Sequence, residues 1–358
     1  MKSYTDFIVD IDILRNNIKN IRKLIGDDTR FCAVVKGNAY SHGANCICNS
    51  IAEYVDYFAV ASIKEAMNIR VFDKRTKILI LGMVEQDSLH WCRENNVAIS
   101  VSSFAQLIDY GKDIDGVCIH LQVNTGLNRF GFRSIVEFKK ALDYIDKRGY
   151  ILEGIYSHFA TKKEDKNFIK RQNYRFQRFK SVVKKEGVIF HISNSFATEY
   201  DDKYRYDMVR NGFLMYGYMD NNIGNKPILT IRSRIVNILK ARKGDTVGYD
   251  RTYRVTKPMT IGIVPVGYAD GLDRRLSNKF SVLIKGRRCK IVGLICMDVF
   301  MVDLTDVNAK IGDTVTLLGS DGEESINLQN YSEALELSPY AVLLGFDYRR
   351  MNYIVKNK

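Results

Sequence analysis

The sequence contains no long hydrophobic run, although 46% of its 358 residues are apolar. No stretch approaches the roughly 18 consecutive apolar residues that a membrane-spanning helix needs. The first six residues, Met1-Lys2-Ser3-Tyr4-Thr5-Asp6, also lack the apolar core of a signal peptide. The sequence therefore argues against a membrane protein and predicts a globular protein of the cytoplasm.

Cysteine is sparse, and its spacing indicates neither a disulfide framework nor a metal site. The seven cysteines are odd in number and scattered, and only Cys46 and Cys48 lie close together. A C-x-C pair without a second pair is a weak signal for a metal ion. We expect free thiols in a reducing compartment and no bound metal.

Acidic residues are outnumbered, with 41 Asp and Glu against 54 Lys and Arg, which gives a net charge of +13. The basic residues occur as dispersed pairs, such as Lys184-Lys185 and Arg287-Arg288, and not as one stripe with aromatic residues between them. This distribution argues against nucleic-acid binding. A basic surface would instead help to attract an anionic cofactor.

Proline is also rare, and all four prolines lie beyond residue 226, at Pro227, Pro258, Pro265 and Pro339. The segment Asp220-Asn221-Asn222-Ile223-Gly224-Asn225, just before the first of them, is typical of a loop. Together these observations predict a boundary between a first domain at 1–226 and a second domain at 227–358.

Strand and helix patterns alternate in the first domain. After an opening helix whose cap is predicted at Asp12, eight short apolar runs follow, at Phe31–Val35, Tyr57–Val60, Ile78–Leu81, Ala98–Val101, Val117–Val123, Ile151–Tyr156, Val188–Ile192 and Tyr206–Val209. Two of the helical patterns between them begin with capping boxes, Ser62-x-x-Glu65 and Ser134-x-x-Glu137.

Eight βα repeats over this length predict an α/β fold, a (β/α)8 TIM barrel. A doubly wound parallel sheet is the alternative. It would need a glycine-rich phosphate loop after the first strand, and Gly37-Asn38-Ala39 is not one.

The second domain has the pattern of a compact, mostly β domain. Glycine and Asx residues separate six apolar runs, at Leu229–Leu239, Met259–Val264, Ser281–Ile284, Lys290–Ile295, Val299–Leu304 and Thr314–Leu318. One helix is predicted at about Leu328 to Leu337.

One lysine, Lys36, stands at the end of the first apolar run, in the segment Ala33-Val34-Val35-Lys36-Gly37-Asn38-Ala39-Tyr40-Ser41-His42-Gly43. A lysine at the end of a buried strand is poorly hydrated, which lowers its pKa. A neutral amine is the form that Schiff-base chemistry needs. A lysine that merely leaves the barrel for solvent would be the other explanation.

Further unusual residues follow later strands of the predicted barrel. Arg129, His158, Ser195 and Arg210 with Gly212 come after the fifth, sixth, seventh and eighth runs. A TIM barrel carries its active site at the carboxyl ends of its strands, so we expect these residues to converge with Lys36 on one rim. Each alone has an ordinary explanation, such as a surface ion pair, a core histidine, a helix cap or a turn.

The segment around Lys36 resembles the cofactor-lysine motif AVVKANAYGHG of the alanine racemases, which use pyridoxal 5′-phosphate (PLP). Val264-Pro265-Val266-Gly267-Tyr268-Ala269-Asp270-Gly271 is similar to the P-x-G-Y-A-D-G motif of that family. Val292–Asp298 resembles V-G-R-I-C-M-D, and Asp347-Tyr348-Arg349 resembles a final S-Y-R. The matches run from Ile8 to about Arg350, which is nearly the whole chain.

This resemblance implies a homodimer with shared active sites, in which a small amino acid is racemised between two bases. Lys36 would hold PLP and act as one base, and Tyr268 of the partner subunit would be the other. His158 would hydrogen-bond to Tyr268 and Arg210, with Arg210 facing the pyridine nitrogen of PLP. Arg129 and the backbone of Met297 would contact the substrate carboxylate. The phosphate would be held by Tyr40, Ser195, Gly212, Phe213 and Tyr348.

Three positions depart from the family pattern. Gln122 replaces a lysine that is carbamylated in some members, although its amide could still orient Arg129. Leu294 replaces the arginine of V-G-R-I-C-M-D, and Lys163 replaces an acidic residue. The last two positions line the substrate entryway in the family, so substrate identity is less constrained than reaction type.

Alanine is the expected substrate, and racemisation of serine or another amino acid by the same machinery is the nearest alternative. A PLP decarboxylase of the same architecture would pair the ring nitrogen with a glutamate and need a cysteine near the C-terminus, where the last cysteine is Cys296. A non-catalytic PLP carrier of the single-barrel type would lack the second domain that bears Tyr268.

Overall fold

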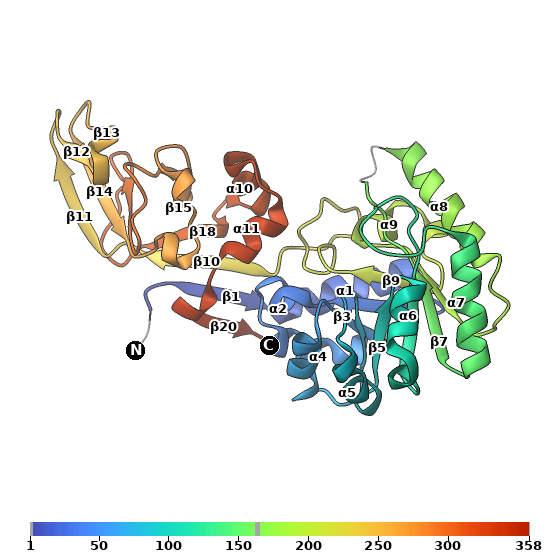
Figure 1. Cartoon of the computed structure of the whole chain (residues 1–358). Helices are drawn as coiled ribbons and strands as arrows, with labels where there is room; N and C mark the ends of the chain where they lie inside the picture. The colour runs from blue at the N-terminus through green and yellow to red at the C-terminus, as the bar shows by residue number, and fades with distance from the viewer. Residues whose placement is uncertain (1–2, 162–164, 358) are drawn as a thin grey trace. The chain divides into compact units, whose positions relative to one another are not determined.

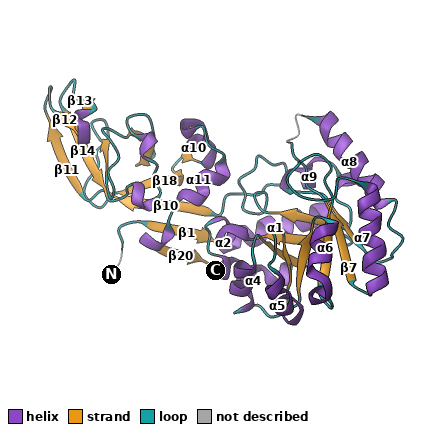
Figure 2. Cartoon of the chain, viewed as in Figure 1, coloured by secondary structure: helices purple, strands orange, loops and turns teal. Residues whose placement is uncertain are grey.

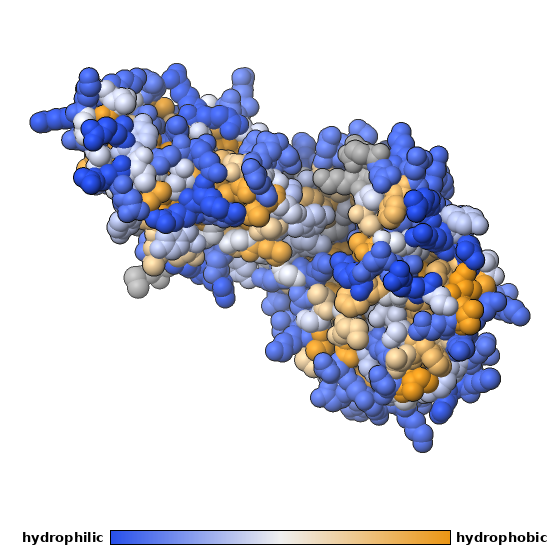
Figure 3. Space-filling model, turned by 45° about the horizontal axis from the view of Figure 1, so that its top comes forward, coloured by the Kyte–Doolittle hydropathy of each residue, from blue (hydrophilic) through white to orange (hydrophobic). Residues whose placement is uncertain are grey.

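The structure is a computed structural model that describes residues 3–161 and 165–357 (Figures 1 and 2). The chain forms two compact units. The barrel unit comprises Ile13–Ala39 and Gly43–Pro227, and the second unit comprises the described parts of Met1–Asp12, Tyr40–His42 and Ile228–Lys358. Hydrophilic side chains cover most of the face shown in Figure 3, and hydrophobic ones form separate patches on each unit.

Eight parallel strands form the barrel in the order β8-β7-β6-β5-β4-β3-β2-β9. They are β2 (Arg30–Val34), β3 (Tyr57–Val60), β4 (Lys77–Ile80), β5 (Val97–Val101), β6 (Cys118–Gln122), β7 (Ile151–Tyr156), β8 (Ile189–His191) and β9 (Met208–Asn211). Two backbone hydrogen bonds connect β8 and β9, which stand at the two ends of this order, and so close the barrel. Asp207 N–H donates to the Phe190 carbonyl, and Arg210 N–H donates to the Ser193 carbonyl. The predicted (β/α)8 barrel is confirmed, and the doubly wound sheet is excluded.

Helices lie outside these strands (Figure 2). They are α1 (Ile11–Ile25), α3 (Ala44–Ile51), α4 (Ile63–Arg70), α5 (Leu89–Glu94), α6 (Phe104–Tyr110), α7 (Ile135–Arg148), α8 (Lys166–Lys180) and α9 (Ser195–Tyr200). Because α1 already begins at Ile11, Asp12 lies in its first turn, where its charge favours the helix N-terminus. The prediction that Asp12 is the N-cap was therefore wrong, because the residue that precedes the helix is Asp10.

Only half of each predicted capping box forms. The hydroxyls of Ser62 and Ser134 accept hydrogen bonds from the backbone N–H groups of Glu65 and Glu137. Among the residues that the structure describes, neither carboxylate accepts a bond from the N–H of its own serine, and both accept from other backbone groups. Glu65 accepts from the N–H groups of Gly37 and Ala61, and Glu137 accepts from that of Phe104.

The second unit is mostly β, as predicted. Its main sheet has the order β16-β15-β18-β10-β1-β20, with β19 paired to β18, and the separate sheets are β11-β14-β17 and β12-β13. The strands are β1 (Asp6–Asp10), β10 (Leu229–Arg234), β11 (Asn237–Ala241), β12 (Thr246–Val247), β13 (Tyr253–Arg254), β14 (Met259–Val264), β15 (Ser281–Ile284), β16 (Arg287–Lys290), β17 (Phe300–Asp303), β18 (Thr314–Asp321), β19 (Glu324–Ile326) and β20 (Asn352–Lys356).

Several boundaries in this unit differ from the sequence pattern. The apolar run at 229–239 splits into β10 and β11, which belong to different sheets. The run at 290–295 contributes only Lys290 to a strand, because the turns that follow place Cys296 and Met297 beside another loop. The predicted helix is α10 (Leu328–Leu335), and the sequence analysis missed α11 (Pro339–Gly345).

Two strands from opposite ends of the chain pair side by side in the main sheet. β1 is parallel to β20, with Phe7 opposite Tyr353, and antiparallel to β10, with Phe7 opposite Ile231. Phe7 and Ile231 are fully buried, so this pairing is part of the core of the second unit. Neither β1 nor β20 was predicted from the sequence, because both have only five residues and carry a charged residue at one or both ends.

Candidate active site

Lys36 begins a strained turn at the carboxyl end of β2. Residues 37–41 all have positive φ angles, between 53° and 65°, so α2 (Lys36–Tyr40) is a left-handed turn. Only Gly37 adopts this conformation without a steric penalty, since a residue with a side chain costs roughly 1–2 kcal/mol there. Such strain persists only where surrounding contacts fix the backbone, and it is concentrated at functional sites.

Contacts on both sides of the turn provide that support. Glu65 Oε1 accepts a 2.6 Å hydrogen bond from Gly37 N–H. Within the turn, Ala39 N–H donates to the Val35 carbonyl at 2.8 Å, and the Asn38 side-chain oxygen accepts from Ala44 N–H at 2.8 Å. The backbone that carries Lys36 is thereby held by α4 on one side and by the start of α3 on the other.

The ammonium group of Lys36 is destabilised in this position. Burial lowers the pKa of Lys36, and the positive charges of Arg129 and Arg210 lower it further, while Glu65 opposes the shift. The structure thus brings Lys36, Arg129 and Arg210 within electrostatic reach of one another. The neutral amine that the sequence analysis expected is favoured by this surrounding.

Arg210 is buried, with 4% of its surface exposed, and its guanidinium is fixed by four contacts. Nη1 donates to His191 Nδ1 at 2.6 Å and to the His191 carbonyl at 3.3 Å. Nη2 donates to the Ser157 carbonyl at 2.7 Å and lies 3.3 Å from His158 Nδ1. Within the described part of the chain, no hydrogen bond uses Nε, so this N–H can serve an external acceptor.

His158 lies among cations and is neutral. Burial lowers the pKa of His158 to about 3, with further contributions from Arg210, Arg129 and Lys36. Its Nδ1 faces the Arg210 guanidinium, which can only donate, so this nitrogen accepts. The expected contact between His158 and Arg210 is therefore present.

Arg129 lies on the loop that follows β6 and is exposed. The Asn124 side-chain oxygen accepts from the N–H groups of Gly126 and Asn128, and Phe132 N–H donates to the Gln122 carbonyl, which closes the loop. Among the described residues, the Gln122 side chain makes no hydrogen bond to Arg129. It accepts from the Tyr156 hydroxyl at 3.1 Å instead, so the expected orientation of Arg129 by Gln122 is not seen.

Ser195 and Gly212 are joined at the ends of β8 and β9. Gly212 N–H donates to Ser195 Oγ at 3.0 Å, and Asn194 caps the short helix that begins with Ser195. Beside them, Phe213 is 5% exposed. Asn211 is fully buried, and neither its amide nitrogen nor its amide oxygen has a hydrogen-bond partner among the described residues. The sequence analysis did not anticipate this unsatisfied amide.

In the second unit, Tyr268 and Met297 lie together on neighbouring loops. Tyr268 N–H donates to the Cys296 carbonyl and Ala269 N–H to the Met297 carbonyl, each at 3.1 Å. A Cβ atom at Gly267 would lie 2.0 Å from the Met297 carbonyl oxygen, so only glycine allows this approach. Both side chains border a surface hollow of about 950 Å³, and they are 43% and 53% exposed.

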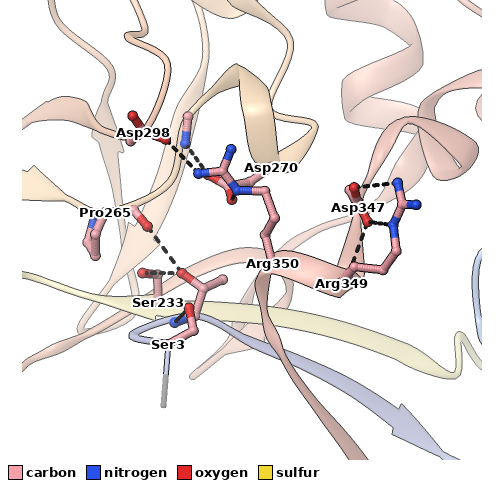
Figure 4. A network of polar contacts seen from close by, with 10 residues as sticks. Ser3, Ser233, Pro265, Asp270, Asp298, Asp347, Arg349 and Arg350 are labelled. Atoms are coloured by element: carbon pink, nitrogen blue, oxygen red, sulfur yellow. Dashed lines mark hydrogen bonds and ion pairs between the residues drawn. The ribbon is translucent and has the colours of Figure 1, made fainter. Parts of the chain in front are cut away.

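Arg350 links the two loops that carry Tyr268 and Met297 (Figure 4). Its Nε lies 3.1 Å from Asp270 Oδ1, and its Nη2 donates to Asp298 Oδ1 at 2.6 Å. The other carboxylate oxygen of Asp270 accepts from Gly267 N–H at 2.8 Å. From the sequence, Arg350 marked only the approximate end of the family resemblance, because its role depends on loops that are distant in the sequence.

The remaining predicted positions also have defined surroundings. Tyr348 packs against Phe7 and Tyr353, with ring centroids 5.6 Å and 5.1 Å apart. Tyr40 is 8% exposed and packs against Tyr340 at 5.8 Å. Leu294 is half-buried. Lys163 lies outside the described residues.

The fold and this site define a two-domain barrel enzyme, with a lysine whose pKa is lowered at the end of a barrel strand and with a tyrosine-bearing β unit in the same chain. The model "Alanine racemase, N-terminal domain" matches residues 9–220, and "Alanine racemase, C-terminal domain" matches residues 228–354. The chain belongs to the alanine racemase family.

Individual relatives agree with this assignment. The chain is 33% identical over 357 residues to "Alanine racemase 1" of Caldanaerobacter subterraneus subsp. tengcongensis, which covers 93% of this chain and 90% of that protein. It is 33% identical over 353 residues to an alanine racemase of Streptococcus pneumoniae (strain 70585), over 96% and 94% of the two chains.

Solved structures of the family have the same fold. The alanine racemase from E. faecalis matches with a TM-score of 0.93 at 30% identity, over 98% of each chain. The alanine racemase from Bacillus anthracis with bound L-Ala-P matches with a TM-score of 0.91 at 31% identity, over 100% of this chain and 96% of that one.

No helix within residues 3–161 and 165–357 is long and apolar enough to span a membrane. All seven cysteines are free thiols, and Cys32, Cys48, Cys92 and Cys289 are buried.

Proposed function

We propose that this protein is a PLP-dependent racemase that interconverts L-alanine and D-alanine. The observation that carries this proposal is Lys36, whose pKa is lowered by burial and by Arg129 and Arg210 at the end of a barrel strand. An amine in this state can attach the aldehyde of PLP. The relatives named above, which are alanine racemases, support alanine as the substrate.

The donor groups of the barrel unit fit PLP. Lys36 would hold the aldehyde carbon, and the N–H of Arg210 Nε would face the pyridine nitrogen. The Ser195 hydroxyl and the Gly212 and Phe213 backbone would hold the phosphate. The family resemblance gives the same role to Tyr40 and Tyr348, which belong to the second unit. The unpaired amide of Asn211 lies next to Gly212 in the chain and supports a polar ligand there. When bound, PLP supplies the electron sink that makes the Cα proton of the substrate acidic.

Arg210 directs the outcome of this chemistry. A guanidinium does not readily give up its proton, so Arg210 would keep the ring nitrogen of bound PLP unprotonated and make the ring a weak electron sink. A weak sink favours return of a proton to Cα over transamination or decarboxylation. Arg210 is therefore the residue that favours racemisation over the reactions of related PLP enzymes.

A two-base racemisation places one general base on each face of Cα. Lys36 would act on one face and Tyr268 on the other. His158 would hydrogen-bond to both Arg210 and Tyr268. Arg129 and the Met297 backbone would position the substrate carboxylate. We propose that each subunit consists of a domain at 1–226 and a domain at 227–358. Two such subunits would form a homodimer in which Tyr268 of one completes the active site of the other. The exposure of Tyr268 and Met297 beside a large hollow supports such a partner. A cytoplasmic location stays a prediction.

Two measurements on the purified protein test this function. Its absorption spectrum should show a visible band from bound PLP, and borohydride should fix the cofactor to the peptide that contains Lys36. Chiral chromatography after incubation with L-alanine, L-serine, L-lysine and L-arginine should show alanine as the best substrate. Serine should follow within about a hundredfold, since an apolar pocket rejects an added hydroxyl only weakly. Label on another lysine, or release of CO2 in place of a D-amino acid, would contradict the proposal.

A further inference from the structure

A line of buried polar side chains runs through the barrel interior below Arg210. His191 Nε2 lies 2.9 Å from His120 Nδ1, and His120 Nε2 lies 3.1 Å from Glu153 Oε2. The other oxygen of Glu153 accepts from Lys77 Nζ. We call Arg210, His191, His120, Glu153 and Lys77 the barrel-core network. It extends from near the carboxyl end of β9 to Lys77, the first residue of β4, whose side chain is 29% exposed.

The two ends of the barrel-core network determine the direction of every hydrogen bond in it. The Arg210 guanidinium can only donate, so His191 Nδ1 must accept and Nε2 must carry the proton. His191 therefore donates to His120 Nδ1, and His120 in turn donates from Nε2 to the carboxylate of Glu153. Both imidazoles are held as the Nε2–H tautomer.

Both histidines are neutral, as this arrangement requires. They are fully buried. Burial, with the charges of Lys77 and Arg210, lowers the pKa of His120 to about 3. Burial, Arg210 and His120 lower the pKa of His191 well below its usual value. Through the hydrogen bonds of these two neutral histidines, the barrel-core network connects the carboxylate of Glu153 to the guanidinium of Arg210.

The packing of the barrel interior preserves this geometry. A Cβ atom at Gly154 would lie 2.3 Å from His120 Nδ1, so β7 carries a glycine where the imidazole needs room. The Tyr156 ring stacks on His191 at 5.0 Å with an interplanar angle of 8°, and the Arg210 guanidinium carbon lies 5.2 Å from the same ring. Such complementarity indicates a selected arrangement, because most barrel interiors are filled by branched apolar residues.

We propose that Glu153 is a positioning residue for the racemase reaction, which fixes the tautomers of His120 and His191 so that His191 holds the guanidinium of Arg210 in place. This inference rests on the proposed function, in which Arg210 faces the ring nitrogen of PLP. Without an acceptor at Glu153, His120 can carry its proton on Nδ1, which would then oppose the N–H of His191. His191 would rotate or change tautomer, and Arg210 would lose its shortest hydrogen bond.

Three variants of the holoenzyme separate this role from general stability. Glu153→Leu removes the acceptor, Glu153→Gln keeps one carbonyl oxygen for His120, and Lys77→Met removes only the cation at the exposed end. We expect Glu153→Leu to lower kcat about 10- to 100-fold with KM within about threefold, and to alter the absorption spectrum of the bound cofactor. Glu153→Gln should restore most of kcat. Lys77→Met should lower kcat much less than Glu153→Leu does, because His120 keeps its acceptor.

Nitrogen-15 NMR of histidine-labelled protein reads the tautomers directly, and only five histidines contribute signals. Three of them, His120, His158 and His191, should be Nε2–H tautomers that do not change between pH 6 and pH 8 in the wild type. The signals of His120 and His191 should change in Glu153→Leu. If Glu153→Leu does not fold, Gly154→Ala gives the same test by displacing the His120 ring. Unchanged tautomers, or equal spectra and kcat in Glu153→Leu and Lys77→Met, would overturn the proposal. Should the protein bind no PLP, the proposed function fails, while the tautomer signals still decide whether Glu153 sets the network.

Discussion

Arg210 and Tyr268 are held in place in two different ways. Arg210 is 4% exposed and is fixed by hydrogen bonds inside the barrel, whereas Tyr268 is 43% exposed on a loop that Arg350 links to its neighbour. Buried hydrogen bonds to a charged group are strong because water does not compete with them. Exposed ion pairs are weak and are screened by salt. The barrel part of the site is thus held by strong buried contacts, and the second-unit part is held by weaker, partly exposed ones.

Replacing Lys36 by alanine should give the largest effect, because it removes both the point of cofactor attachment and one base from the barrel part. We expect activity to fall by more than about 10⁴-fold, with no visible absorption from covalently held cofactor. Kinetics and absorption spectra of Lys36→Ala would measure this. Lys64→Ala, which changes an exposed lysine on α4, is the control and should retain full activity. Measurable racemisation by Lys36→Ala above a thousandth of wild type would contradict the assignment.

Replacing Tyr268 by phenylalanine should cost less, about 10²- to 10⁴-fold, because it removes one base and leaves the barrel part intact. Mixing Lys36→Ala and Tyr268→Phe subunits should then restore activity. In a symmetric dimer with shared sites, each heterodimer has one site with both lesions and one intact site, so about half of the wild-type activity per dimer returns. Subunit exchange is confirmed by mass spectrometry of tagged chains. Exchange without recovery would place Tyr268 in the site of its own subunit.

Mild acid should destabilise the barrel through its neutral histidines. The pKa values of His120 and His158 are lowered to about 3, and that of His191 is lowered well below its usual value, whereas an unfolded histidine titrates near 6.5. Below pH 6.5 the unfolded chain binds protons that the folded chain does not, so the free energy of unfolding decreases as pH falls. Each histidine should contribute about 1 kcal/mol of this loss between pH 7 and pH 5.5.

Urea unfolding at the two pH values, followed by a probe in the barrel unit, measures this loss. The loss should be smaller in His120→Asn, although that variant is less stable at pH 7. His90 is exposed, and His90→Gln should behave like the wild type. An unfolding free energy that does not decrease from pH 7 to pH 5.5 would show that the buried histidines are not kept neutral.

The smallest effect is expected at the exposed link in the second unit. Arg350→Gln should lower kcat/KM only a few-fold, because Gly267 and the backbone hydrogen bonds between the two loops remain. About 0.5 M salt should produce a similar change in the wild type and little further change in Arg350→Gln. Arg349→Gln is the matched control, since Arg349 pairs only with Asp347 among the described residues. Equal effects of the two substitutions would remove Arg350 from the positioning of Tyr268.

The sequence was sufficient for the barrel because each of its strands is a continuous apolar run between helices with 3.6-residue periodicity. It was less informative for the second unit, where β1 and β20 depend on pairing between the two ends of the chain. A strand of five residues with Asp6 and Asp10 at its ends carries little periodic signal. The split of 229–239 into two strands of different sheets also depends on tertiary pairing, which local pattern does not encode.

The site residues also divide into those that local sequence indicates and those that depend on tertiary contacts. Lys36, Arg129, His158 and Arg210 were predicted because they follow barrel strands, and the structure brings them together. His120 and Glu153 were not predicted, because a polar residue in the middle of a buried strand gives no sign of its partner on another strand. Glu65 was recognised as a helix cap, but its carboxylate supports Gly37 instead, which only the three-dimensional proximity of α4 and the turn reveals.

The pairing of β1 with β10 and β20 also has a consequence for synthesis of the protein. The residues of β1 leave the ribosome long before its partner strands, which begin at Leu229 and Asn352. At translation rates of about 5–20 residues per second, β1 waits roughly 10 seconds or more for its first partner. All eight barrel strands lie between β1 and Leu229, so the barrel can form while β1 is still unpaired. During that interval the nascent chain exposes a sheet edge, which makes β1 the segment where chaperones or misassembly would act first.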